Sequence, residues 1–344
     1  DVAALTSSDP GDQSAEATLA RRKGVCGGYA RLFEALARAA GLEAVEVIGF
    51  SRGAGYVPGA PLGAQPDHAW SAVKVDGEWR LIDCTWAAGY LDGDTFVRRS
   101  DDYYFLTPPD HFVYDHLPAD PKWQLSESPL SKEDFERLVY LRPGFFRCGL
   151  RVVSHPQIEV TSEGSLTVVF AGPEDVLLRG RVGEQPGRDD AAQTFVQRDG
   201  DQLKLNTSFS HAGVYTLRIY AKKRGDTGPY DWAADYLVRV PRVTGEQASY
   251  PEVMSTFQEC SARLFSPLTG RLKAGSEQAF KLTAPGADAV AVIMGGAWSK
   301  LEKHGDVWEG KLPVKGDAAQ VAARFPGSAS YYVLLIYKID ESGG

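Results

Sequence analysis

An Asp-Gly dipeptide at positions 76–77 stands between two strand-like runs, residues 69–75 and 78–85. Asp-Gly is favoured in a two-residue type I′ turn, so the pattern predicts an antiparallel hairpin. Because side chains alternate between the two faces of a sheet, His68 and Asp83 are expected on the same face of this hairpin as diagonal neighbours. A three-residue loop would instead shift the register and place them on opposite faces.

A helix is predicted over residues 27–40, directly after a cysteine. Apolar residues recur at three- and four-residue spacing through this stretch, and Gly41 follows as a C-terminal cap. Cys26 is therefore expected at the helix N-terminus, where unpaired N–H groups and the helix dipole lower the pKa of a thiol. Gly27 and Gly28 leave the sulfur unobstructed. The alternative for Cys26 is a small buried hydrophobic residue, which is the commoner role of a free cysteine.

Cys26, His68 and Asp83 together provide the chemical groups of a Cys-His-Asp catalytic triad. A thiol is a weak nucleophile until a base removes its proton, and that base needs an acidic residue to fix its tautomer. Taken singly, His68 also suits a hydrogen-bonded core histidine, and Asp83 suits a carboxylate that satisfies a turn. The joint arrangement favours catalysis, so we predict these three as the catalytic residues.

The sequence around the three residues resembles the transglutaminase-like superfamily, and more narrowly the kyphoscoliosis peptidase group. The resemblance is carried by residues 22–30, 67–70, 77–89, 102–106 and 123–125, which include the Gly-Val-Cys-Gly-Gly-Tyr, Asp-His-Ala-Trp and Ile-Asp-Cys-Thr-Trp segments. It covers residues 1–150 well and the rest more loosely.

By this resemblance Cys26 is the nucleophile, His68 the general base and acid, and Asp83 the orienting carboxylate, while Cys84 has no role. The resemblance implies a transglutaminase-like cysteine peptidase that attacks protein or peptide substrates with a thiolate, forms an acyl-enzyme and works in a cytoskeletal setting. Two alternatives stay open. One is a protein-glutamine acyltransferase or deamidase, because water or an amine can release an acyl-enzyme. The other is a non-catalytic cytoskeletal adaptor that binds its partner through tandem β modules.

The start of the chain is also interpreted through the resemblance. Family members have helices that lead to an Ile-x-Tyr-Asp-Val-like segment before the nucleophile, whereas this chain opens at Asp1-Val2 and soon reaches Cys26. We therefore expect the catalytic domain, residues 1–145, to be truncated at its N-terminus.

Residues 87–125 are rich in Asp, Tyr, Pro and His, and their prolines favour extended or turn backbone. This stretch is predicted to be irregular and wrapped on a core, held by aromatic side chains that include Phe105, Phe112, Tyr114 and Trp123. The pairs Asp110-His111 and Asp115-His116 do not predict a metal site, because the prolines deny them a common helical face. A short helix capped by Ser131 is expected through Leu138.

After residue 145 the pattern changes to short strands separated by Gly, Pro and Asp turns, which is typical of β-sandwiches. The expected strands are 166–170, 176–182, 203–205 and 214–220, and, after a linker at 241–247, 278–282, 289–294, 308–312 and 331–337. The predicted fold class is α+β: a papain-like/transglutaminase-like core, then two all-β immunoglobulin-like sandwich modules. Their predicted ranges are 146–245 and 246–344.

Composition and charge limit the classes of partner that the chain is expected to bind. The chain of 344 residues has a net charge of −8 with both signs mixed throughout, which disfavours nucleic acid and anionic membrane surfaces as partners. It contains no apolar run long enough for a membrane span, and we expect no signal peptide. Its four cysteines are too few for a disulfide scaffold and lack Cys-x-x-Cys spacing, so we expect reduced thiols and a cytoplasmic protein without cofactor or metal. No oligomeric state is predicted.

Overall fold

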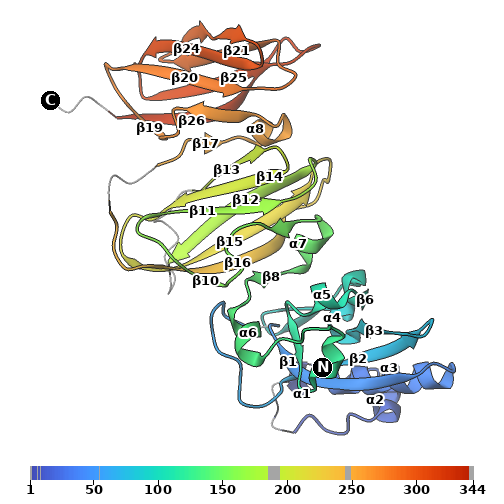
Figure 1. Cartoon of the computed structure of the whole chain (residues 1–344). Coiled ribbons are helices and arrows are strands. Elements are labelled where there is room, and N and C mark those ends of the chain that lie inside the picture. Colours follow the sequence, from blue (N-terminus) through green and yellow to red (C-terminus); the bar gives the residue numbers. More distant parts are fainter. Residues whose placement is uncertain are drawn as a thin grey trace. The chain divides into compact units, whose positions relative to one another are not determined.

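A computed structural model describes residues 2–5, 7, 9–53, 55–184, 194–244 and 249–340. The chain divides into two compact units, Asp1–Pro143 and Gly144–Gly344. Each unit is described by itself below, with its elements labelled as in Figure 1.

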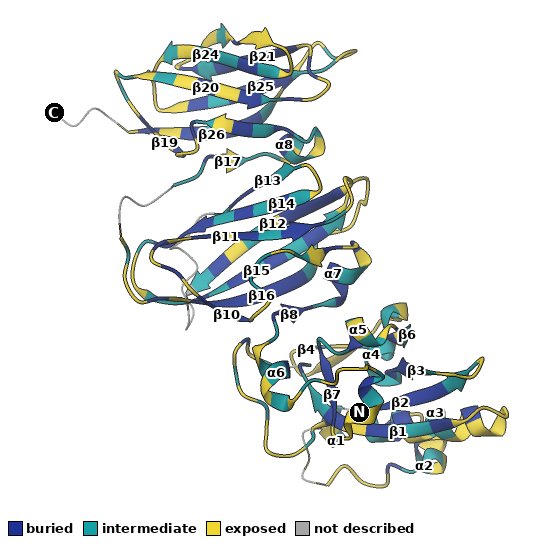
Figure 2. Ribbon diagram, in the orientation of Figure 1, coloured by how far each residue is buried: buried dark blue, intermediate teal, exposed yellow. Residues whose placement is uncertain are grey.

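The first unit is built on one antiparallel sheet with the strand order β6-β3-β2-β1-β7. Its strands are β1 (Ala44–Ser51), β2 (His68–Val75), β3 (Glu78–Ile82), β6 (Phe105–Thr107) and β7 (His116–Pro118). Helix α3 (Cys26–Ala39) packs against β1 and β2 (Figure 1). Strand β2 is the buried centre of this sheet, with its first six residues all buried (Figure 2).

The β2–β3 hairpin has the predicted register. Its pairs run from Val75 opposite Glu78 to Ser71 opposite Ile82, and Asp76 and Gly77 both have positive φ, as a type I′ turn requires. The second strand is shorter than the predicted run 78–85. It ends at Ile82 because the next residue caps a helix.

That helix is α4 (Cys84–Ala88), and its N-cap is Asp83. The carboxylate of Asp83 accepts hydrogen bonds from the backbone N–H groups of Thr85 and Trp86, so the chain turns away from the ladder there. The prediction of strand through Thr85 was therefore wrong, because a capping carboxylate in this position competes successfully with strand pairing.

Helix α3 agrees with the predicted helix within one residue at each end, and Gly41 follows it with a φ of +85°. Gly28, two residues after Cys26, also has a packing role. A Cβ on Gly28 would lie 2.7 Å from Oε1 of Gln13 and 2.7 Å from Oγ1 of Thr18, in α2 (Ala15–Arg21). Gly28 thus permits the close approach of the preceding segment to α3.

The segment 87–125 is more regular than predicted. It contains β4 (Gly89–Asp92), β5 (Thr95–Arg98), η1 (Asp102–Tyr104), α5 (Pro109–Phe112) and η2 (Pro121–Gln124), together with the two edge strands β6 and β7. Phe112 and Trp123 pack as expected into the cluster around Val47 and Trp70. The expectation for Phe105 was wrong, since this side chain is 61% exposed.

The remaining elements of the first unit are α1 (Val2–Leu5), α6 (Lys132–Arg137) and β8 (Tyr140–Leu141). Ser131 caps α6 as predicted: it accepts from the Asp134 N–H in a capping box. None of the helices in the described part of the chain is long and apolar enough to cross a bilayer.

The second unit consists almost entirely of β-sheet. Its first two sheets have the orders β10-β16-β15-β12 and β13-β14-β11-β9, and its other two have the orders β17-β26-β25-β21-β22 and β18-β20-β24-β23, with β19 beside β26. Burial alternates along many of the strands, as expected for sheets with one face in a core (Figure 2).

Every strand predicted after residue 145 is present, and the α+β fold class with β-sandwich modules is confirmed. The elements of this unit are α7 (Pro143–Arg147), β9 (Arg151–Val152), β10 (Glu159–Thr161), β11 (Ser165–Ala171), β12 (Val176–Glu184), β13 (Thr194–Asp199), β14 (Gln202–Ser208), β15 (Gly213–Lys223), β16 (Asp231–Val240), β17 (Glu252–Val253), α8 (Ser255–Glu259), β18 (Arg263–Ser266), β19 (Arg271–Lys273), β20 (Glu277–Thr283), β21 (Ala289–Met294), β22 (Ala297–Lys300), β23 (Glu302–His304), β24 (Val307–Pro313), β25 (Ala318–Arg324) and β26 (Tyr331–Asp340). Residues 245–247 of the predicted linker, and the predicted boundary at 245/246, lie outside the described residues.

Candidate active site

Cys26 is the first residue of α3 and has an acidic thiol. Burial raises the pKa of this thiol, but hydrogen bonds from His68 and from the backbone N–H groups of Ala69 and Gly27 outweigh burial, so the pKa lies below its ordinary value. The other three cysteines differ. Burial raises the pKa of Cys84, Cys148 and Cys260 to about 11 in each case.

His68, the first residue of β2, lies between the thiol and a carboxylate. Its Nε2 is 2.7 Å from Oδ2 of Asp83, and its ring also hydrogen-bonds with Cys26. Burial lowers the pKa of His68, but the Asp83 carboxylate and the Cys26 sulfur outweigh this effect and raise the pKa to about 10. The imidazole is thereby stabilised as the protonated partner of a thiolate.

Asp83 is fully buried and is oriented by the helix it caps. Its Oδ1 accepts from the N–H groups of Thr85 at 2.8 Å and Trp86 at 3.0 Å, which leaves Oδ2 directed at His68. Burial raises the pKa of the carboxyl group, but the neighbouring imidazoles reverse this and hold it well below its ordinary range. The predicted meeting of His68 and Asp83 is present, although a helix cap rather than a strand position provides it.

Trp86 packs against the side of the His68 imidazole. Its ring stacks on His68 with centroids 5.1 Å apart and an interplanar angle of 27°. Gly53 leaves the space that Trp86 occupies, because a Cβ there would lie 2.6 Å from Cζ2 of the indole. The stacking limits rotation of His68 away from Asp83.

The structure adds one residue that the sequence analysis did not place at this site, His116 of β7. Its Nε2 lies 3.0 Å from the same Oδ2 of Asp83 that faces His68, and its Nδ1 lies 2.6 Å from Oδ1 of Asp115. The sequence analysis considered His116 only as a metal ligand beside Asp115. No local spacing connects His116 with Asp83, since 33 positions separate them.

His68, Asp83 and His116 are close enough for their ligand atoms to meet at one metal ion, with these atoms within 4.8 Å of one another. The hydrogen bonds at 2.7 and 3.0 Å already account for this approach. We assign the three side chains to an acid–base network and not to a metal.

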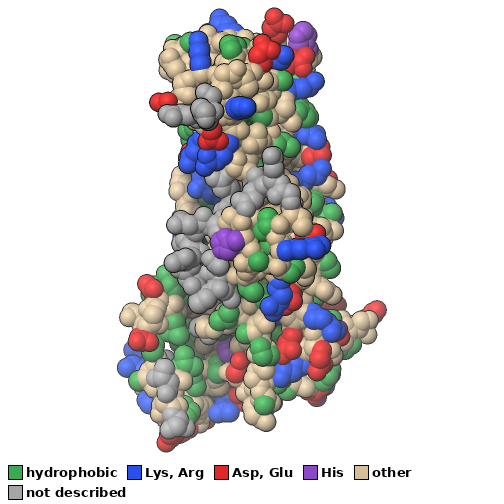
Figure 3. Space-filling view, turned by 90° about the vertical axis from the view of Figure 1, so that its left-hand side faces the viewer, with side chains coloured by type: hydrophobic (Ala, Val, Ile, Leu, Met, Phe, Trp, Pro, Cys, Tyr) green, Lys and Arg blue, Asp and Glu red, His purple; other side chains and the backbone are tan. Residues whose placement is uncertain are grey.

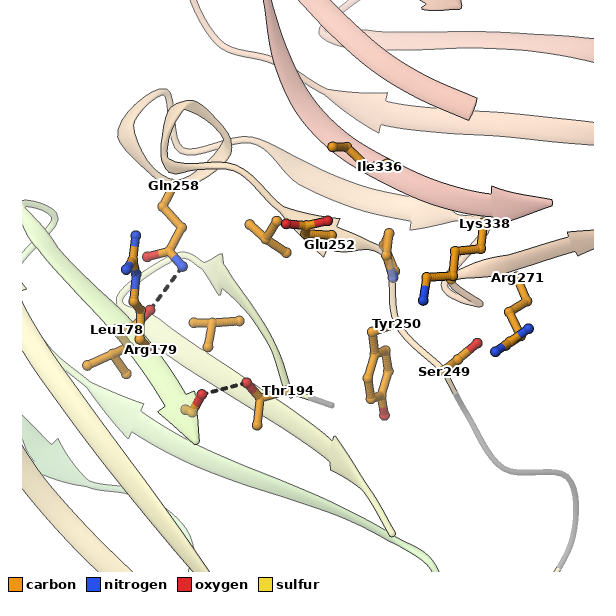
Figure 4. A pocket seen from close by; sticks show the side chains of 15 residues that line it. Leu178, Arg179, Thr194, Ser249, Tyr250, Glu252, Gln258, Arg271, Ile336 and Lys338 are labelled. Carbon is orange, nitrogen blue, oxygen red and sulfur yellow. Dashed lines mark hydrogen bonds between the residues drawn. The ribbon is translucent and has the colours of Figure 1, made fainter. Parts of the chain in front are cut away.

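A cavity of about 420 Å³ lies in the second unit and so is separate from these groups. Figure 4 shows Thr194 of β13, Tyr250, Arg271 of β19 and Lys338 of β26 around it, and the hydrogen bond from Gln258 to the Leu178 carbonyl at its edge. None of the described residues that line it is a cysteine.

Comparison with known proteins identifies the kinds of domain that the chain contains. Residues 3–84, which contain the three predicted catalytic residues, match the family model of the transglutaminase-like superfamily. Residues 132–251 match the model of the KY-like, immunoglobulin-like domain. Residues 3–84 thus match a transglutaminase-like domain.

The chain is also similar to kyphoscoliosis peptidase and related proteins. It is 32% identical to kyphoscoliosis peptidase of Homo sapiens over 243 residues, which are 70% of this chain and 36% of that protein. It is also 32% identical to the Mus musculus protein of that name, over 64% of this chain and 33% of that protein. Hillarin of Drosophila melanogaster is 35% identical over 43% of this chain and 20% of its own length. The chain thus spans about a third of the length of its kyphoscoliosis peptidase relatives.

Proposed function

We propose that the chain is a transglutaminase-like cysteine peptidase with Cys26 as nucleophile, His68 as general base and acid, and Asp83 as the carboxylate that orients His68. One observation carries the proposal: Cys26, His68 and Asp83 form a continuous hydrogen-bonded line in which the thiol is made acidic, whereas burial makes the other three cysteines less acidic.

Acylation follows from this arrangement. The Cys26 thiolate attacks the carbonyl carbon of a peptide or glutamine side-chain amide, a C–S bond forms, and negative charge moves to the carbonyl oxygen. Backbone N–H groups of the first turn of α3 stabilise this oxyanion. His68 then gives its proton to the leaving nitrogen, the C–N bond breaks, and a thioester remains on Cys26.

Deacylation uses the same groups in reverse. His68 takes a proton from the attacking water as that water adds to the thioester, and the C–S bond breaks to give an acid and the free Cys26. If the attacking group is an amine, the product is a new amide. Peptidase, deamidase and acyltransferase activity therefore share the first half-reaction and differ in substrate and acceptor.

Protein or peptide substrates in a cytoskeletal setting are the natural context for this proposal. The resemblance to the kyphoscoliosis group supports the setting, and the word peptidase in the name of the relatives supports hydrolysis. Because of the same resemblance to the kyphoscoliosis group, we propose that the protein works in the cytoplasm.

Selective alkylation tests the activated thiol. We expect iodoacetate at limiting concentration to label Cys26 at pH 6, because its thiolate is stabilised by the His68 imidazolium. Cys84, Cys148 and Cys260 should react only as the pH approaches their pKa of about 11. Peptide mapping by mass spectrometry measures the four rates. Equal rates for the four cysteines at pH 6 would contradict the proposal.

Product analysis separates the reactions. The chain is incubated with denatured casein and a fluorescent primary amine, and the casein is searched for new N-termini, deamidated glutamine and incorporated amine. New N-termini that disappear in Cys26→Ala and persist in Cys84→Ala support the peptidase. Deamidation or amine incorporation with the same dependence supports the acyltransferase or deamidase instead. A reactive Cys26 without any product favours the non-catalytic adaptor for this chain.

A further inference from the structure

His116 is a buried histidine whose two ring nitrogens both face carboxylates. It is 1% exposed. Nε2 lies 3.0 Å from Oδ2 of Asp83, and Nδ1 lies 2.6 Å from Oδ1 of Asp115. Its ring is held by a stacked Phe112 at a centroid distance of 4.0 Å and by Trp86 at 4.4 Å. Such a fixed ring offers the two carboxylates a defined pair of hydrogen-bonding groups.

Asp115 also interacts with a hydroxyl group and two guanidinium groups. Its Oδ2 accepts a hydrogen bond from the hydroxyl of Tyr104 at 3.1 Å, and Arg142 and Arg52 interact with it electrostatically. Among the described residues, the titratable and charged groups around His116 are therefore His68, Asp83, Asp115, Tyr104, Arg142 and Arg52.

The proton count at His116 follows from its partners. An ionised carboxylate only accepts hydrogen bonds, so a ring that hydrogen-bonds to one carboxylate through each nitrogen needs a proton on both. Charge-assisted bonds of this kind are short, as the 2.6 Å separation from Asp115 is. His116 therefore fits its surroundings as an imidazolium.

Oδ2 of Asp83 is the atom that joins this histidine to the proposed chemistry. It faces the Nε2 atoms of both His68 and His116, whose ring centroids are 5.4 Å apart. Two cations that share one carboxylate oxygen compete for its negative charge, because each weakens the attraction that the other experiences.

We propose that His116 is a positioning residue: a buried imidazolium that shares the Asp83 carboxylate with His68 and so sets how tightly Asp83 holds the proton of His68. The role rests on the proposed function, since it acts through the general base of that reaction. It makes a prediction that a merely structural role does not make: removing the charge of His116 strengthens the hold of Asp83 on the His68 proton.

Asp115→Asn tests this with little change of shape. The asparagine amide can donate to Nδ1, so a neutral His116 keeps its Nε2–H bond to Asp83 while losing its charge. The substitution removes the negative charge of Asp115 and the positive charge of His116, and the positive charge is the nearer of the two to His68. We therefore expect the titration of His68 to move upward by about one pH unit. His116→Gln should move it in the same direction, and His111→Gln in α5 is the matched control that should not.

Two measurements on the full chain decide the matter. Side-chain nitrogen NMR reports protonation directly: wild-type His116 should show two protonated nitrogens at pH 7, and in Asp115→Asn it should show one. The pH profile of Cys26 alkylation by iodoacetate reports the coupling, since the anionic reagent is favoured by the His68 imidazolium and the rate falls when that proton is lost. Thermal unfolding checks that each variant is folded.

A neutral His116 in the wild-type chain at pH 7, or a His68 titration that stays or moves downward in both folded variants, overturns the inference. Failure of the proposed function looks different. In that case wild-type Cys26 shows no acid-shifted reactivity, while the nitrogen shifts of His116 and His68 still decide whether the carboxylate is shared.

Discussion

At the scale of single residues, the two carboxylate oxygens of Asp83 have different roles. Oδ1 caps α4 and Oδ2 faces the imidazoles, so the folding role of the residue orients it for its proposed catalytic role. An aspartate that only balanced the charge of His68 would have more rotational freedom. The cap removes that freedom because Thr85 and Trp86 hold the carboxylate plane in place.

Asp83→Asn separates the charge from the cap. The asparagine carbonyl can still accept from Thr85 and Trp86, but its NH₂ group now faces both imidazoles, so we expect His68 to lose its stabilised proton. The titration of His68 should fall from about 10 toward or below the ordinary 6.5, and iodoacetate should lose its preference for Cys26 at pH 7. The pH profile of alkylation measures the fall, and Asp67→Asn, one residue before His68, serves as control. An unchanged profile would contradict the proposed role of Asp83.

The same raised pKa predicts how stability depends on pH. The folded-state pKa of His68 lies above its unfolded value, so the stabilisation is complete below pH 6.5 and is lost as the pH rises toward 10. Asp83 acts in the opposite sense: its lowered pKa stabilises the fold above about pH 4 and this is lost on acidification. The lowered pKa of the Cys26 thiol acts against His68 over this range, so the measurement is made on Cys26→Ala. Urea unfolding of Cys26→Ala between pH 6 and 10 should show the alkaline loss, and the double variant with Asp83→Asn should lack it.

At the scale of elements, β1 is the strand that brings the two histidines together. Gly49 of β1 pairs with His68 on one side and with Pro118 of β7 on the other, and Ser51 pairs with His116. A Cβ on Gly49 would meet the Leu117 carbonyl oxygen, the Trp70 ring and, at 2.8 Å, Cα of Pro118. The missing side chain therefore lets β7 approach closely enough to place His116 beside Asp83.

Gly49→Ala should destabilise the first unit by about 1–3 kcal/mol, because the backbone of β7 cannot relax as a flexible side chain would. Denaturant unfolding measures the free energy. Gly63→Ala is the matched control in the same unit, where the new Cβ would meet nothing closer than 3.6 Å. If both variants unfold like the wild type, the packing role assigned to Gly49 is wrong.

At the scale of the whole molecule, the chain combines a first unit that contains the transglutaminase-like match with a longer β-sheet unit. Basic and acidic side chains are interspersed over the face shown in Figure 3, in keeping with the mixed charge of the sequence. The finer division into domains 1–145, 146–245 and 246–344 remains our proposal.

The two units should unfold separately in calorimetry. Gly49→Ala should lower the midpoint temperature of one transition. Leu334→Ala removes a fully buried side chain of β26, so it should reduce the free energy of unfolding in the other transition by about 2–5 kcal/mol and leave the first transition unchanged. A single transition that both substitutions shift equally would show that the chain unfolds as one cooperative body.

Sequence patterns predicted the parts of the site that depend on near neighbours. The turn at Asp76-Gly77 sets the hairpin register because backbone twist at two residues decides how the strands pair, and the start of α3 at Cys26 follows from the apolar spacing after it. The strand beyond Ile82 was predicted wrongly, since the alternation of residue types does not reveal that Asp83 bonds to the backbone ahead of it.

The sequence by itself thus determined the hairpin, the strands of the second unit and the meeting of His68 with Asp83, and it predicted Cys26, His68 and Asp83 as catalytic residues. All of these rest on interactions over a few positions or on a resemblance. Only the tertiary structure placed His116. Its contact with Asp83 depends on the pairing of β7 with β1 and on the space at Gly49, and such long-range closure leaves no periodic signal in the chain.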